Sequence, residues 1–89
     1  MPRIEFTPHL ARHLDCPAVS VPDHSLRAAF DHVFASNPKL RGYILEDQGS
    51  IRQHVVIFVD GTLVTDRRNW DLPLRPDSRV YVMQALSGG

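Results

Sequence analysis

The sequence has a single cysteine and no long hydrophobic run. Cys16 is its single cysteine, so no disulfide can form within the chain, and a reducing compartment is expected. No apolar run approaches the roughly 18 residues that a membrane-spanning helix requires, and the first residues contain no signal-peptide core. These absences predict a cytoplasmic protein.

The sequence also lacks net charge, because ten basic residues balance ten acidic ones. A neutral chain has no overall basic field that would attract nucleic acid or an anionic membrane. We therefore expect neither among its partners, which must be recognised by shape and local patches. Lysine is scarce as well: Lys39 is the single lysine, and the other nine basic residues are arginines.

Sequence marks of an active site are missing too. Gly42 and Gly49 stand too far apart to form a phosphate-binding loop, and no serine, cysteine or carboxylate lies in a context that marks a nucleophile. We therefore do not expect an enzyme. Three side chains of metal-binding types lie close together without a nearby fourth ligand, which disfavours a metal site: His9, His13 and Cys16.

Alternating apolar and polar residues predict short strands near both ends of the chain. Residues 3–7 alternate, and residues 18–21 form a second short apolar segment, so a hairpin is expected at the amino end. The last predicted strand covers residues 80–85. In it, Val80 and Val82 would face a helix, whereas Tyr81 and Met83 would face away.

One amphipathic helix is predicted between these strands. Its apolar stripe consists of Leu26, Ala29, Phe30, Val33 and Phe34. Ser25 or Asp23 can cap its first turn, and Asn37-Pro38 ends it. Residues 39–47 predict a short turn or helix followed by a short strand.

A second strand-rich region follows. Residues 55–59 are apolar at successive positions, which predicts a central strand covered on both faces. Asp60-Gly61 is a two-residue hairpin turn, with residues 62–64 returning beside that strand. Trp70, in a polar loop, is interpreted as a packing residue. Together these elements predict one α+β domain over residues 1–89, in which a sheet wraps a helix.

The chain resembles the ubiquitin-like β-grasp fold and, within it, the MoaD/ThiS family of sulfur carriers. The resemblance implies a mixed sheet of four to five strands wrapping one main helix, with residues 86–89 as a flexible tail. It covers nearly the whole chain, but Gln84-Ala85-Leu86 replaces the prolines that the family often has before its terminal glycines. The matching segments are the helix stripe Leu26 to Phe34, the strand and turn Val55 to Gly61, the loop Leu74 to Ser78, and the ending Val80 to Gly89.

This resemblance implies a chemistry for the terminal carboxylate of Gly89. In the family, an adenylating enzyme of the ubiquitin-activating type (MoeB/ThiF-like) joins that carboxylate to ATP and releases pyrophosphate. A persulfide or sulfide donor then displaces AMP and leaves a thiocarboxylate. A synthase accepts this sulfur for molybdopterin, thiamine or another sulfur-containing metabolite. ATP and magnesium belong to the activating partner, so no cofactor bound by this chain is expected.

The same resemblance assigns roles around the tail. Ser87 and Gly88 would tether Gly89, since glycine lets an enclosing channel approach the backbone closely. The expected docking surface consists of Tyr81, Met83 and Leu86. Methionine and tyrosine supply adaptable apolar contact area at such interfaces.

Three other functions fit the same ending. The chain could be the small subunit of a molybdopterin synthase, whose tail inserts into a large subunit. It could be a ubiquitin-like modifier joined through Gly89 to target lysines, or an interaction module with an inert tail. A modifier that forms polymeric chains needs acceptor lysines on itself. Because Lys39 is the single lysine, the sequence argues against a chain-forming modifier.

Overall fold

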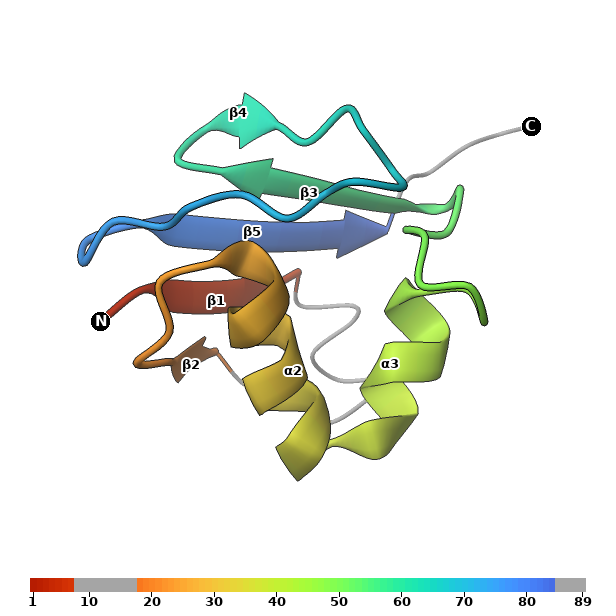
Figure 1. The fold of residues 1–89 in the computed structure, drawn as a ribbon, viewed down its shortest axis with the longest axis horizontal. Helices are drawn as coiled ribbons and strands as arrows, with labels where there is room; N and C mark the ends of the chain where they lie inside the picture. The colour runs from red at the N-terminus through yellow and green to blue at the C-terminus, as the bar shows by residue number, and fades with distance from the viewer. Residues whose placement is uncertain (8–17, 85–89) are drawn as a thin grey trace.

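The computed structural model describes residues 1–7 and 18–84 and contains one mixed sheet with two helices packed against it (Figure 1). In the described residues the sheet has five strands in the order β2-β1-β5-β3-β4. β1 and β5 run parallel, and the other neighbouring pairs are antiparallel. The elements are β1 (Arg3–Phe6), β2 (Val19–Ser20), α2 (Leu26–Ser36), α3 (Pro38–Ile44), β3 (Val55–Val59), β4 (Thr62–Leu63) and β5 (Arg79–Gln84).

The predicted helix is confirmed as α2. The five residues of its apolar stripe are all buried, and the Ser25 side chain accepts a hydrogen bond from the Ala28 N–H at 3.2 Å. Of the two capping candidates, Ser25 therefore fills the position. The helix ends at Asn37, whose N–H bonds to the Val33 carbonyl, and Pro38 opens α3 at a position where its missing N–H costs little.

Aromatic side chains fill the centre of the core beneath α2. Phe30 is 1% exposed, with its ring centroid 5.6 Å from that of Phe34 and 5.7 Å from that of Trp70. The Trp70 indole N–H donates to the Gly49 carbonyl at 2.8 Å, which satisfies its one polar group. The interpretation of Trp70 as a packing residue is confirmed.

The prediction that residues 55–59 are covered on both faces is wrong. In β3, burial alternates: Val55, Ile57 and Val59 are buried against the helices, whereas Val56 and Phe58 are half-exposed. The reason is that both helices pack on one face of the sheet, and no described element covers the other (Figure 1). A continuous apolar run therefore marks a strand with two apolar faces, of which only one is closed.

The turn after β3 has the predicted geometry. Asp60 has φ 51° and Gly61 has φ 83°, the left-handed pair that a two-residue hairpin requires. β4 is one residue shorter than predicted, although the Val64 N–H still donates to the Ile57 carbonyl at 2.9 Å. The last predicted strand is confirmed from Arg79 to Gln84.

Candidate functional site

The predicted reacting residue Gly89, its tether Ser87 and Gly88, and the docking residue Leu86 lie outside the described residues. The described chain reaches Gln84, five positions before Gly89. At the predicted site, the structure therefore describes the last two residues of β5, Met83 and Gln84, and the surfaces that border them. We call these two residues the tail root.

The tail root is paired along one side. In the register of β3 and β5, Val55 lies opposite Gln84, and Val56 lies opposite Met83. On the β1 side the described register ends two residues earlier, at Phe6 and Val82, where the Thr7 N–H donates to the Val82 carbonyl at 3.1 Å. Within the described residues, the backbone of the tail root is therefore paired with β3 alone.

A hydrogen bond from α3 also reaches the tail root. The Tyr43 hydroxyl donates to Oε1 of Gln84 at 2.9 Å in a partly buried position. The Tyr43 ring packs edge-on against His54, with centroids 5.2 Å apart and planes at 87°. Neither Tyr43 nor Gln84 was a predicted site residue. The one sequence signal for this contact is that Gln84, a polar residue, follows Val80 and Val82 at the inward-facing positions of β5.

The face of the sheet away from the helices, named here the open face, carries apolar side chains. Tyr81 is 37% exposed, with Phe58 as its neighbour on β3, and Leu63 beyond Phe58 is 45% exposed. Both predicted docking residues in the described chain lie here, with Tyr81 exposed and Met83 half-buried. Because the covering of β3 was misjudged, sequence reasoning missed the rest of the open face, which is Val56, Phe58 and Leu63.

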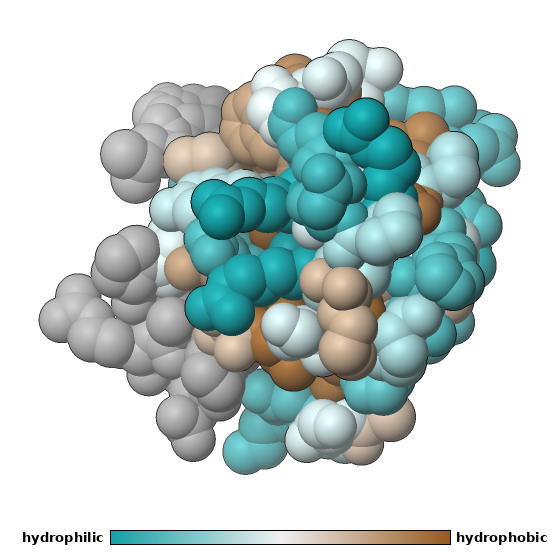
Figure 2. Space-filling view, turned by 90° about the vertical axis from the view of Figure 1, so that its left-hand side faces the viewer, coloured by the Kyte–Doolittle hydropathy of each residue, from teal (hydrophilic) through white to brown (hydrophobic). Residues whose placement is uncertain are grey.

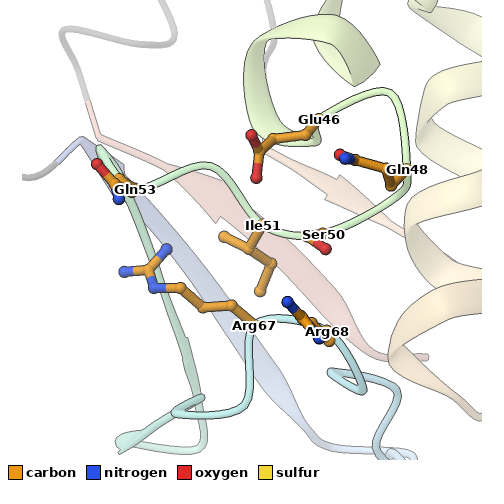
Figure 3. A pocket seen from close by; sticks show the side chains of 7 residues that line it. All are labelled: Glu46, Gln48, Ser50, Ile51, Gln53, Arg67 and Arg68. Carbon is orange, nitrogen blue, oxygen red and sulfur yellow. The ribbon is translucent and has the colours of Figure 1, made fainter.

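A polar hollow of about 630 Å³ lies near the start of β3, between the segment after α3 and the loop after β4 (Figure 3). Its two walls are joined by hydrogen bonds: the Ile51 N–H donates to the Arg67 carbonyl at 2.9 Å, and Nη1 of Arg67 donates to the carbonyls of Arg52 and Val55 at 2.6 and 2.9 Å. Arg67 is therefore a structural tie. The lining residues are Glu46, Gln48, Ser50, Ile51, Gln53, Arg67 and Arg68.

The opposite end of β5 is held by a polar network. Asp60 accepts from the Arg79 N–H and from the Ser78 hydroxyl, each at 2.9 Å, and the Arg75 guanidinium lies 3.7 Å away. These interactions lower the pKa of Asp60, the largest cause being the Arg79 N–H, followed by Ser78. Figure 2, which views the molecule from the left-hand side of Figure 1, shows a mainly hydrophilic surface. The hydrogen bonds that Asp60 accepts from Ser78 and Arg79 therefore anchor the start of β5.

A second lowered pKa also belongs to a turn. The Asp66 carboxylate accepts from the N–H groups of Asn69 and Arg68 at 2.9 and 3.0 Å, and these two bonds, the former being the larger cause, lower its pKa. Across residues 1–7 and 18–84, no three histidine, cysteine or acidic side chains gather as metal ligands would. His9, His13 and Cys16 lie outside the described residues. No helix in the described ranges is long and apolar enough to cross a membrane.

Comparison with known proteins establishes the fold. No protein-family model and no curated protein matches the sequence. The fold is the ubiquitin-like β-grasp, as the resemblance predicted, and it recurs in small proteins over their full length. At identities below 25%, this likeness concerns the fold alone.

Three of the similar structures are informative. A chain in the BexX/CysO complex of Amycolatopsis orientalis has a TM-score of 0.80 at 11% identity, covering 100% of both chains. Small archaeal modifier protein 1 from Methanosarcina acetivorans has a TM-score of 0.78 at 13% identity, covering 99% of this chain and 95% of that one. Urm1 of Sulfolobus solfataricus has a TM-score of 0.71 at 14% identity, covering 93% and 99% respectively.

Proposed function

We propose that this chain is a cytoplasmic sulfur carrier protein whose Gly89 carboxylate is converted to a thiocarboxylate. The observation that carries the proposal is the placement of the central strand β5, which leads within five residues to the ending Ser87-Gly88-Gly89. A β-grasp domain with this ending presents a narrow, unhindered carboxylate on a stable support.

The chemistry starts from an unreactive group. A carboxylate is ionised at neutral pH and is a poor electrophile, since neither oxygen is a good leaving group. A MoeB/ThiF-like partner would supply ATP and magnesium and form an acyl-adenylate on Gly89, releasing pyrophosphate. Sulfide then attacks the carbonyl carbon, the bond to AMP breaks, and a thiocarboxylate remains for an accepting synthase. A persulfide donor would instead form an acyl disulfide, whose S–S bond a thiol reductant must then cleave to leave the thiocarboxylate. The chain acts as a co-substrate in this scheme.

The open face is the proposed docking surface for the activating enzyme. It begins at the tail root with Met83 and continues through Tyr81, so a partner seated on it would lie beside the emerging tail. Its exposed members are apolar and aromatic, the types enriched at the centres of interfaces. Leu86 would extend this surface along the tail.

The proposal is tested by intact-protein mass spectrometry. Incubation with the MoeB/ThiF-like enzyme of the same cell, Mg-ATP and a sulfur donor should raise the mass by the difference between sulfur and oxygen. Fragmentation should place the change on Gly89. A Cys16→Ser variant is the matched control, because a persulfide on Cys16 would add a whole sulfur atom and would disappear in this variant. Removal of Gly88-Gly89 should abolish the change without altering the melting temperature.

A ubiquitin-like modifier is the second candidate. The similar fold of a protein named small archaeal modifier protein 1 favours it, and Gly89 would again be the reacting residue. If the chain becomes joined to lysines of other proteins and no thiocarboxylate forms, the result would favour the modifier function over the carrier function. A stable complex with a molybdopterin synthase large subunit would narrow the carrier to a small subunit of that enzyme. No modification with the right partner would overturn both candidates.

A further inference from the structure

Three elements meet at Gln84. Its backbone pairs with Val55 of β3, its side chain accepts from Tyr43 of α3, and it is the last residue of β5. His54, next to Val55, packs edge-on against the Tyr43 ring. The last described position before the tail is therefore held from the side by a strand and from the inner face by a helix.

The helix that provides this contact is itself fixed. Leu40 and Ile44 of α3 are buried, at 0% and 1% exposure. Nε of Arg52 donates to the Gly42 carbonyl at 2.8 Å, and the Arg52 N–H donates to the Ile44 carbonyl at 3.0 Å. Tyr43 thus stands on a support that is tied to the segment leading into β3.

The chemistry of the contact suits orientation better than stability. Gln84 continues the inward alternation of Val80 and Val82, a position that an apolar side chain can also occupy in a strand. Replacing both partners of a hydrogen bond by apolar groups of similar shape can be nearly neutral for folding. A hydrogen bond, in contrast, weakens steeply when its angle departs from linearity, so it fixes direction as well as distance.

Direction at this position is amplified along the tail. Five residues can span at most about 17 Å, since an extended chain advances roughly 3.4 Å per residue. A swing of about 10° at the root then shifts the mean position of the far end by at most about 3 Å. Control of the exit direction therefore bears directly on how often the terminal carboxylate is aligned.

We infer that Tyr43 is a positioning residue that acts through Gln84 to set the direction in which the tail leaves β5. This inference rests on the proposed function, because the benefit lies in presenting Gly89 to the activating enzyme. The Tyr43 hydroxyl takes no part in the reaction. Its loss reduces the fraction of chains that are ready to bind, while the bound complex reacts as before.

Kinetics of adenylation provide the test, measured as pyrophosphate exchange with the MoeB/ThiF-like enzyme. Tyr43→Phe and Gln84→Met should each raise KM about two- to tenfold, the range that the loss of one hydrogen bond of ordinary strength allows, with kcat unchanged. Gln84→Glu should keep the KM of the wild type, because the glutamate carboxylate can also accept the hydrogen bond from the Tyr43 hydroxyl. Ser78→Ala is the control: it weakens the opposite end of β5 and should leave KM unchanged well below its melting temperature.

Nitrogen-15 relaxation on the full chain separates this inference from the proposed function. Tyr43→Phe should increase fast motion of the Gln84 amide and of those after it, whereas Ser78→Ala should not. An unchanged KM, or a fall in kcat alone, would overturn the positioning role while leaving the carrier function intact. If the wild-type chain is never adenylated, the proposed function fails, and the relaxation comparison alone decides whether Tyr43 orients the tail root.

Discussion

The two ends of β5 are held in different ways. At its start, Ser78 is 2% exposed, and its hydroxyl donates to Asp60 and accepts from the Arg75 N–H. The Arg3 N–H of β1 donates to the Ser78 carbonyl, and the Asp60 N–H of the β3–β4 turn donates to the Arg79 carbonyl. At its end, within the described residues, Gln84 is paired with β3 on one side and bonds to Tyr43. The comparison shows that β5 is anchored at its start by a buried polar network, and at its described end by one neighbouring strand and one side-chain hydrogen bond.

The largest expected effect comes from the core under both ends. Phe30→Ala should lower the free energy of unfolding by about 3–5 kcal/mol, because it removes a buried aromatic ring and leaves a cavity. Urea denaturation measures the loss, and hydrogen exchange should accelerate at both ends of β5 alike. Phe30→Leu, which retains much of the volume, should cost clearly less. A stable Phe30→Ala variant would mean that the core does not support the sheet as described.

A substitution at the start of β5 should destabilise that end of the strand and leave the other end unchanged. Ser78→Ala removes a buried hydroxyl that donates to Asp60 and accepts from Arg75, which should cost about 1–3 kcal/mol. Amide exchange should accelerate at Arg79 and remain slow at Met83. The matched control is Ser36→Ala on the exposed end of α2, which should change stability by less than about 0.5 kcal/mol. Equal effects of the two variants would show that the network contributes no anchorage.

Acid should weaken the same end through Asp60. Because hydrogen bonds to the charged form lower the pKa of Asp60 in the folded protein, its contribution is fully present above the unfolded value of about 4 and is lost as pH falls through the folded pKa. The stability advantage of the wild type over Asp60→Asn should therefore be constant above about pH 5 and shrink below it. Denaturation at a series of pH values checks this. An advantage that grows on acidification would contradict the assigned cause.

The open face should yield the smallest effect on stability and a clear effect on binding. Tyr81→Lys with Met83→Lys should change the free energy of unfolding by less than about 1 kcal/mol, since both positions are at least partly exposed and Glu5 lies beside Tyr81. Calorimetric affinity for the activating enzyme should fall about tenfold or more. Two lysines placed at Ala35 and Ser36 on α2 provide the control for added charge. Unchanged affinity in the folded Tyr81/Met83 variant would move the docking surface elsewhere.

Local patterns were sufficient for most of the fold. The helical spacing from Leu26 to Phe34 predicted α2, and the Asp60-Gly61 pair predicted the hairpin, because each signal depends on neighbouring residues. The covering of β3 was misjudged since an unbroken apolar run records the character of both faces without recording what packs on them. That information lies in the placement of the helices, which the run itself does not contain.

The candidate site was predictable to a lesser extent. Tyr81 and Met83 follow from alternation in one strand, and the structure places both on the open face. The bond between Tyr43 and Gln84 joins positions 41 residues apart, so no short pattern could indicate it. Arg67 illustrates the same difficulty, because its guanidinium binds two carbonyls from a segment 12 to 15 residues earlier in the chain.

The parallel pairing of β1 with β5 has a consequence for synthesis in the cell. β5 is the last described strand along the chain, yet it occupies the middle of the sheet, between β1 and β3. A growing chain that has not yet produced residues 79–84 must keep the edges of β1 and β3 unpaired, and such exposed edges favour aggregation. The sheet therefore closes only after residues 79–84 have been made, and we expect a chain that stops before them to remain unfolded.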